Sequence, residues 1–320
     1  MSLYGNNSKI ISRYSNMLRK WYIKKENKFI NLICEPYQNL EFVYDLVKDC
    51  LKNGEKVLYV GKSKKVCRAD VVNSINFYFS SFENIFRIRE KFDLIIFDDV
   101  SLYSNKNIME CNEDLIYLKN LCGKIIICSV DKIFNNIDHK EVLNENRKTH
   151  FLEPRLITTR VNLEKAMPYI LYEYIEWFIR EKRVLVIYVP KEIKKEYVYD
   201  YYTKDLKLED KVRILKSNKN TSILKVMEES NYRKEGIIYI TDSLQDYFDY
   251  DPKCDLIIYF FNKEIVDYKK IIFACGLLGK NKYKNREVIL LSNDENEQIE
   301  IARRLARSFN ETLWRDIEGE

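Results

Sequence analysis

Short apolar runs alternate with longer amphipathic stretches along the whole chain, and this alternation limits the possible folds more than any other feature. Runs rich in isoleucine, leucine and valine without polar alternation are typical of strands buried on both faces of a parallel sheet. Between them, stretches such as Phe42–Leu51 have apolar residues at helical spacing. The sequence therefore predicts an α/β protein with mainly parallel sheets. The expected strands are Phe29–Cys34, Lys56–Val60, Phe92–Phe97, Lys124–Cys128, Arg155–Val161, Val184–Val189, Gly236–Thr241, Asp255–Phe261 and Glu287–Leu291.

The alternation occurs in both halves of the chain, and a length of 320 residues is enough for two domains. Pro154 interrupts regular structure between the halves, just before a strand-like run. We therefore expect a basic arm at residues 1–28, a first α/β domain at residues 29–152 and a second at residues 153–320. Further helices are expected at Leu163–Lys182, Lys194–Tyr202 and Asn296–Phe309.

Composition excludes several classes of protein. The longest apolar runs, such as Leu256–Phe261, are far shorter than the ~20 residues of a membrane-spanning helix, so no membrane span is expected. The eight cysteines never approach C-x-x-C spacing, and neither His139 nor His150 has a cysteine or carboxylate at ligand spacing, so no metal site is expected. Residues 1–9 lack the pattern of a signal peptide. These features predict a cytoplasmic protein with reduced cysteines.

The positive charge is concentrated at one end. The formal net charge of the chain is +5, yet residues 1–28 contain seven Lys or Arg against Glu26 alone. Such an excess is typical of a surface that binds an anionic backbone, but a solvated surface of a lysine-rich protein has the same composition. Tyr14, Trp21 and Tyr22 lie between these cations, where they would either stack on bases or close an amphipathic helix onto the first domain.

An acidic pair follows one of the buried strands, in the stretch Phe92–Val100 that ends with Asp98 and Asp99 before a valine. A carboxylate at the end of a strand would hold magnesium, and the next acid would orient the attacking water. Solvation or turn chemistry explains the same two residues without a function. Two successive α/β domains with this pair resemble the tandem RecA-like, P-loop NTPase-type domains of superfamily 2 helicases, in which the pair is the Walker B motif.

Further segments follow one another in the order found in ComFA, the late-competence DNA translocase of that superfamily. The resemblance covers nearly the whole chain and implies an ATP-driven motor on DNA. It rests on the order and spacing of several segments: Leu152–Arg155, Ile175–Glu181, Arg183–Pro190, Ile237–Ile240 with Thr241 and Leu244 as motif V, Phe273–Lys280 in place of the Q-x-x-G-R-x-G-R box, and Glu287–Leu290.

The phosphate loop departs from the pattern of that family. Where G-x-G-K-T should follow the first strand, the chain reads Glu35-Pro36-Tyr37-Gln38-Asn39. A phosphate cradle needs consecutive backbone N–H groups, glycines that leave room and a lysine for the terminal phosphates. Pro36 removes one donor, Tyr37 stands in a glycine position and Gln38 replaces the lysine. We expect Glu35, Gln38 and Asn39 to be vestiges of a triphosphate site.

Other motifs of that family also lack residues that would act on a nucleotide. In the Q-x-x-G-R-x-G-R box the glutamine is Phe273 and the first arginine is Leu277, while Lys280 stands at the last position. Loss of an arginine finger costs up to ~10³–10⁵ in rate. The zinc module found at the amino end of that family is missing as well. We expect Lys280, Asp98 and Asp99 to be vestigial, with no cofactor bound, and Asp98 to hold magnesium only if a magnesium nucleotide binds.

Nucleic-acid contact is expected at two positions. Lys62, Lys64, Lys65 and Arg68 follow the second strand, where motif Ia of the family contacts the backbone, and Thr241 stands in motif V. An ordinary solvated loop is the competing interpretation of the four cations.

The sequence leads to one leading functional hypothesis and two alternatives. The leading hypothesis is a catalytically degenerate helicase-like scaffold that binds single-stranded DNA or proteins of the competence and DNA-uptake machinery. One alternative is an ATP-dependent DNA translocase with an atypical phosphate site, for which the pair Asp98-Asp99 is the support. The other alternative is a protein-interaction module that does not contact nucleic acid.

Overall fold

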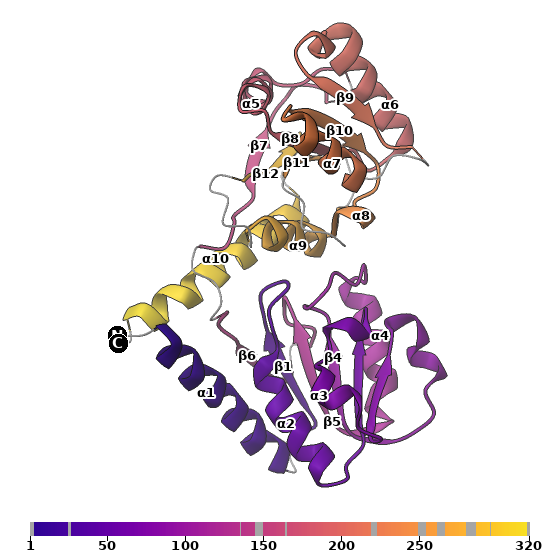
Figure 1. Ribbon diagram of the computed structural model, residues 1–320, viewed down its shortest axis with the longest axis vertical. Helices are drawn as coiled ribbons and strands as arrows, with labels where there is room; N and C mark the ends of the chain where they lie inside the picture. The colour runs from indigo at the N-terminus through magenta and orange to yellow at the C-terminus, as the bar shows by residue number, and fades with distance from the viewer. Residues whose placement is uncertain are drawn as a thin grey trace. The chain divides into compact units, whose positions relative to one another are not determined.

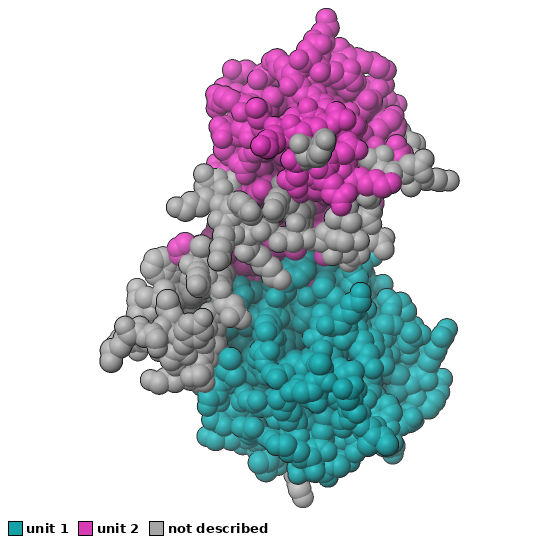
Figure 2. Space-filling model, viewed as in Figure 1, with its two compact units in different colours: residues 1–149, 311–320 teal, residues 150–310 magenta. Residues whose placement is uncertain are grey.

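The computed structural model describes residues 3–24, 27–134, 136–144, 150–163, 165–218, 223–248, 254–260, 266–279, 286–294 and 296–318. The chain divides into two compact units, which are coloured teal and magenta in Figure 2. Unit 1 comprises residues 1–149 and 311–320, and unit 2 comprises residues 150–310. The division thus falls at residue 150 rather than between residues 152 and 153, and the carboxyl-terminal residues group with unit 1.

Unit 1 contains a six-stranded parallel sheet with the strand order β3-β2-β4-β5-β1-β6. The four strands predicted for this half are confirmed, because their continuous apolar runs fill the buried centre of the sheet. The edge strands β3 and β6 were not predicted, since they are short and β6 is fully exposed. The strands are β1 (Phe29–Ile33), β2 (Val57–Gly61), β3 (Phe77–Ser80), β4 (Phe92–Asp98), β5 (Cys122–Ser129) and β6 (Asp138–Glu141).

The helices of unit 1 pack on this sheet and on each other. α2 follows β1 directly, and α1 lies against α2 (Figure 1). α4 begins with a capping box, in which Asn107 and Glu110 bond each other's backbone N–H groups. The elements are α1 (Leu3–Ile23), α2 (Glu41–Lys52), α3 (Ala69–Val72) and α4 (Ile108–Lys119), with short 3-10 turns η1 (Lys64–Val66) and η2 (Phe82–Arg87).

Unit 2 contains a second six-stranded parallel sheet, with the order β7-β12-β11-β8-β10-β9. All five strands predicted for this half are present, and the short strand β9 is additional. The predicted fold class is confirmed: the protein is α/β, with two tandem parallel-sheet units consistent with RecA-like domains. The strands are β7 (Arg155–Thr158), β8 (Val184–Tyr188), β9 (Arg213–Lys216), β10 (Ile237–Thr241), β11 (Cys254–Phe260) and β12 (Val288–Ser292).

The helix predicted at Leu163–Lys182 is shorter in the structure. α5 begins at Tyr169 because Pro168 is its N-cap, and the residue before a proline is disfavoured in the helical conformation. Leu163 and Met167 nevertheless join the same core from outside the helix, which is why the apolar periodicity extended too far. The elements are α5 (Tyr169–Arg180), α6 (Glu192–Asp200), the π turn η3 (Tyr201–Asp205), η4 (Leu208–Asp210), α7 (Ile223–Arg233), α8 (Gln245–Phe248), α9 (Tyr268–Gly279) and α10 (Glu297–Glu318).

Each unit has its own apolar core between sheet and helices. Because all strands of each sheet are parallel, their carboxyl ends meet at one edge, where the loops that follow β1 and β4 come together in unit 1. Within the described part of the chain, no helix has both the length and the apolar character to cross a membrane.

Candidate functional site

The loop between β1 and α2 holds the residues expected to be vestiges of a phosphate site. Glu35, Pro36 and Gln38 are buried, Tyr37 is half-buried and Asn39 is exposed. Residues 36 and 37 form a tight turn, in which the Gln38 N–H donates to the Glu35 carbonyl at 3.2 Å. Tyr37 at the third position of the turn has a φ of 60°. Proline second and a positive φ third are the features of a type II turn, in which the third position favours glycine. The backbone at Tyr37 therefore has a glycine-like conformation.

The backbone donors of this loop are bonded within the chain. The Cys34 N–H donates to the Ser129 carbonyl at 2.9 Å, and the Tyr37 N–H donates to the Val100 carbonyl at 2.6 Å. Pro36 has no N–H to offer. Together with the bond from Gln38 to Glu35, these contacts direct the N–H groups toward neighbouring backbone. A phosphate cradle requires N–H groups that converge on an anion.

Side chains complete the closure of the loop. The Gln38 side chain accepts a hydrogen bond from the Glu35 N–H at 3.0 Å and donates to the Leu143 carbonyl at 2.8 Å. The Glu35 carboxylate accepts from the Asn144 amide at 2.9 Å. Both polar groups of Gln38, the residue in the lysine position, are therefore occupied by the protein.

Asp98 ends β4 at the same edge of the sheet and is only 2 % exposed. Its Oδ2 accepts from the Tyr59 hydroxyl at 2.6 Å, and its Oδ1 accepts from the Val100 and Ser101 N–H groups at 3.1 and 2.9 Å. Burial raises the pKa of Asp98, although the hydrogen bonds from Tyr59 and Ser101 act in the opposite direction. Both carboxylate oxygens are thus held by neutral donors of unit 1 itself.

Asp99 is buried as well, and its side chain turns toward α4. Its Oδ1 accepts from the Ser104 hydroxyl at 2.6 Å, and its Oδ2 lies 3.7 Å from the Cys111 thiol. The Tyr37 N–H donates to the Val100 carbonyl, and the Val100 N–H donates to Asp98, so the loop after β1 and the acidic pair are linked through one residue. The structure thus brings Glu35, Gln38, Asp98 and Asp99 to one edge of the sheet.

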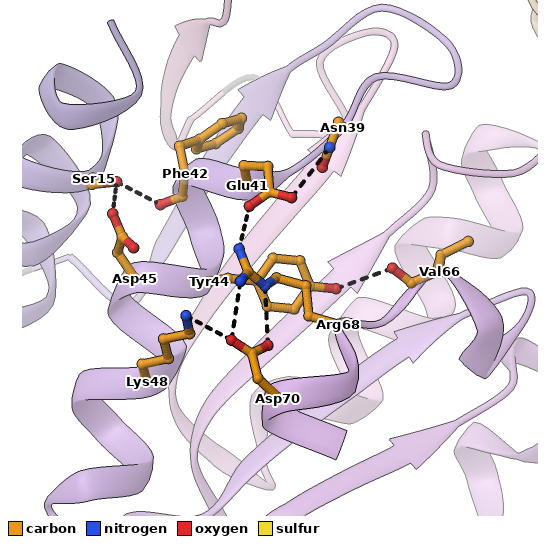
Figure 3. Close-up of polar contacts among 10 residues, drawn as sticks. All are labelled: Ser15, Asn39, Glu41, Phe42, Tyr44, Asp45, Lys48, Val66, Arg68 and Asp70. Carbon is orange, nitrogen blue, oxygen red and sulfur yellow. Dashed lines mark hydrogen bonds and ion pairs between the residues drawn. The ribbon is translucent and has the colours of Figure 1, made fainter. Parts of the chain in front are cut away.

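Arg68, one of the expected DNA contacts, belongs to an ion-pair cluster with α2 and α3 (Figure 3). Its guanidinium makes two hydrogen bonds of 3.0 Å to Asp70 and also bonds Glu41. Lys48 joins the cluster through Asp70 at 2.7 Å. Hydrogen bonds from Lys48 and Arg68 lower the pKa of Asp70 to about 2. Arg68 is therefore engaged with acids of unit 1.

The other expected contacts differ in their environment. Lys64 and Lys65 are exposed on η1, whereas Lys62 is half-buried. Thr241 is buried at the end of β10, and its hydroxyl donates to the Ser243 carbonyl at 2.9 Å. Lys280 lies outside the described residues. Lys64 and Lys65 are thus the two predicted contacts most accessible to a ligand.

Several residues of this edge could not be found from the sequence. Tyr59 is 39 positions from Asp98, and Asn144 is 109 positions from Glu35. The carboxyl edge of the unit 2 sheet holds a further polar cluster, in which Lys195 is 4 % exposed. Its Nζ bonds Asp242 at 3.0 Å and the Ser217 hydroxyl at 3.2 Å. Burial raises the pKa of Asp242, but these two partners outweigh it and the pKa lies below its ordinary value.

Within the described residues, no group of three His, Cys, Asp or Glu side chains is placed to hold a metal ion. The carboxylates at the unit 1 edge are instead surrounded by hydroxyl and backbone donors of the chain.

Comparison with known proteins gives similarity of structure alone. No family model and no curated protein matches the sequence. The DExH-box NTPase HrpB of E. coli has 10% sequence identity and a TM-score of 0.48, with 92% of this chain and 42% of HrpB covered. Dbp5 of S. cerevisiae bound to RNA and ADP BeF3 has 10% identity and a TM-score of 0.37, with 93% and 80% covered. The chain thus spans less than half the length of HrpB.

Proposed function

We propose that this protein is a helicase-like binding protein that has lost ATP hydrolysis and uses its α/β scaffold to bind DNA or a protein partner. The observation that carries the proposal is the hydrogen-bonded turn at residues 35–38. Its N–H groups, its glutamine and its glutamate bond the chain itself, which leaves none of them directed at a phosphate. The glycine-like backbone of Tyr37 supports descent from a loop that once held a glycine there.

The state of Asp98 supports the same proposal. A carboxylate that holds magnesium must turn a lone pair toward the ion and its waters. In this protein both oxygens of Asp98 accept hydrogen bonds inside unit 1, and its pKa is raised by burial. The donor to Oδ2 is Tyr59, a phenol whose pKa is well above its usual value and which therefore keeps its proton.

On the partner side, we propose single-stranded DNA and proteins of the competence and DNA-uptake machinery. The support is the ComFA-like order of segments in the sequence together with the exposed cations Lys64 and Lys65 on η1. Exposed cations suffice for contacts to a phosphate backbone, because such contacts need charge and donors rather than base recognition.

The alternative of an ATP-dependent translocase has one observation in its favour, the acidic pair Asp98-Asp99 at the end of β4. Thermal unfolding with and without magnesium ATP separates the two functions. A nucleotide present at a hundred times its dissociation constant adds ~2.7 kcal/mol to the native state, which for a chain of 320 residues corresponds to a shift of about 4 °C in Tm. We expect a shift of less than about 1 °C.

Phosphate release provides the second measurement. We expect no release above background, with or without single-stranded DNA, and no difference between the wild-type protein and Asp98→Asn. Release that DNA stimulates and that Asp98→Asn abolishes would contradict the proposal and establish the translocase.

A further inference from the structure

One face of α1 fixes the helix to unit 1. The Ser15 hydroxyl donates to the Asp45 carboxylate at 2.7 Å and to the Phe42 carbonyl at 3.1 Å (Figure 3). Arg19 pairs with Asp49 at 2.6 Å. Three large side chains of this face are buried: Tyr14, Leu18 and Trp21. The inner face of α1 therefore docks on α2 through both apolar and polar contacts.

The carboxyl end of α1 is also held in place. The Lys124 ammonium, on β5, donates to the Asn27 carbonyl at 2.5 Å and to the Lys24 carbonyl. It also lies 4.9 Å from the centre of the Trp21 ring. A cation close to the last carbonyls of a helix interacts favourably with the helix dipole. The end of α1 therefore has a fixed position on the sheet of unit 1.

Two cations lie on the opposite face of α1, and a third follows directly after its last residue. Arg13, Lys20 and Lys24 are exposed, and so is Asn16 between the first two. Steps of three and four residues keep Arg13, Asn16 and Lys20 on one side of the helix, over a length of about 10 Å, and Lys24 follows directly after the last helical residue, Ile23. Among the described residues, none of the three cations has an acidic partner. We call these four residues the α1 stripe.

All charged residues of α1 are positively charged. The sequence of α1 from Leu3 to Ile23 contains no acidic residue at all. The nearest acids on α2, Asp45 and Asp49, face the inner side of α1 and bond Ser15 and Arg19. A helix face that carries cations and an amide donor and no acid of its own matches a polyanion, because phosphates need positive charge and N–H donors without a specific pocket.

Tyr14, Trp21 and Tyr22 of the arm do not take part in such an interaction. Tyr14 and Trp21 are buried, and the Tyr22 hydroxyl donates to Glu55 at 3.0 Å. Base stacking by these rings is therefore excluded in this structure, which leaves backbone contact as the chemistry of the outer face.

We propose that the α1 stripe binds the phosphate backbone of nucleic acid without reading its bases. The proposal rests on the proposed function, in that the protein binds nucleic acid, and it places a second contact surface on α1, apart from the η1 lysines. The stripe would follow several phosphates of one strand, since B-DNA carries one charge per about 3.4 Å of each strand.

Salt dependence tests the α1 stripe. A fluorescent oligothymidylate is titrated with the full chain between about 50 and about 200 mM salt, and log Kd is plotted against log salt. The variant is Arg13→Gln/Lys20→Gln/Lys24→Gln. Removal of three phosphate contacts should lower the slope by about 2. The control is Lys91→Gln/Lys119→Gln/Lys132→Gln, which removes the same charge from exposed positions elsewhere in unit 1. Its slope should stay close to that of the wild-type protein.

Each outcome has a distinct meaning. A wild-type protein that does not bind the oligonucleotide even at low salt would overturn the nucleic-acid part of the proposed function, and the stripe with it. Wild-type binding with equal slopes for the two triple variants would overturn the stripe alone. Tighter binding to poly-L-glutamate than to the oligonucleotide would instead identify an acidic protein as the partner. Unchanged thermal unfolding of the stripe variant verifies that α1 still docks, since Arg19 and its partner are retained.

Discussion

Asp98 at the end of β4 and Asp255 near the start of β11 are both buried, one in each unit, and they are stabilised in different ways. Asp98 in unit 1 is 2 % exposed, and both of its oxygens accept bonds from neutral donors. Asp255 in unit 2 is 0 % exposed and pairs with Arg183 at 2.7 Å. Its Oδ1 also accepts from the Glu287 N–H at 2.8 Å, whereas its Oδ2 has no hydrogen-bond partner in the described structure.

The comparison shows that a charge partner does not by itself satisfy a buried carboxylate. Arg183 is itself partly desolvated, with its guanidinium 4.7 Å from the centre of the Trp177 ring. Burial lowers the pKa of Arg183 and raises the pKa of Asp255 to about 6. Hydroxyl and backbone donors can bond both oxygens of a buried acid without a counter-charge. Three predictions test this difference, beginning with the largest effect, and a fourth compares a residue with positive φ from each unit.

Removal of the arginine should have the largest effect on stability. We expect Arg183→Met to lower the free energy of unfolding by about 3–5 kcal/mol at pH 8, because a buried carboxylate then loses its counter-charge. The loss should be smaller at pH 5, where Asp255 takes up a proton. Denaturant unfolding measures both values. The control is Arg155→Met, whose exposed pair with Glu287 should contribute only about 0–1 kcal/mol. Equal losses for the two variants would contradict the prediction.

The pH dependence of unit 2 should follow Asp255. Burial raises its pKa from 3.8 to about 6; Arg183 and Arg286 act against that rise, and Glu287 adds to it. Since the unfolded carboxyl ionises at the lower pH, Asp255 stabilises the fold below pH 4. That contribution, about 3 kcal/mol, is lost as the pH rises from about 4 through about 6. Asp255→Asn should flatten the stability profile in this window. A profile identical to that of the wild-type protein would assign the pH dependence to other groups.

The neutral donors of unit 1 are tested by removing one hydroxyl. Tyr59→Phe takes away the donor to Asp98 Oδ2 and should cost about 1–3 kcal/mol, because a buried acceptor is left without its bond. Tyr44→Phe is the matched control, since Tyr44 stacks beside Tyr59 and its hydroxyl donates to the Val66 carbonyl at 3.4 Å rather than to Asp98. Its cost should be about 0.5 kcal/mol or less. A similar cost for both variants would show that the bond to Asp98 has no special weight.

The smallest expected change in the free energy of unfolding concerns two residues with positive φ, Lys234 in unit 2 and Tyr37 in unit 1. Lys234 follows α7 with a φ of 54°, and Tyr37 has a φ of 60° in the turn after β1. We expect Lys234→Gly to stabilise the protein by about 0.5–1 kcal/mol. Tyr37→Gly should gain less, because the half-buried ring is lost. Thermal unfolding of both variants provides the comparison, and a larger gain for Tyr37→Gly would mean that the ring contributes nothing to the loop.

The sequence predicted the central strands of both sheets because each is a continuous apolar run that lies in a buried position. It did not predict β3, β6 and β9, since a short edge strand is defined by its neighbour rather than by its own residues. The predicted start of the α5 helix, at Leu163, was wrong for a similar reason. Leu163 and Met167 continue the apolar pattern because they face the same core, not because they are helical.

The residues of the candidate site were named from the sequence, but their partners were not. Proline at position 36 and tyrosine at position 37 predict a loop without a phosphate cradle, whatever the fold around it. The bonds from Tyr59 to Asp98 and from Asn144 to Glu35 join distant parts of the chain, so only the strand order brings them together. For Arg68, a sequence of cations could not reveal that acids from α2 and α3 surround it.

The turn at residues 35–38 also bears on how such a protein evolves. The Gln38 side chain bonds the backbone of Glu35 and Leu143, and the Glu35 carboxylate bonds the Asn144 side chain, so replacing Gln38, Glu35 or Asn144 leaves a polar group of the turn without its partner. Changing this turn would therefore need several substitutions at once, each destabilising alone. This epistasis couples the three residues, so a lineage that carries the turn can change it without loss of stability only by replacing its bonded side chains together.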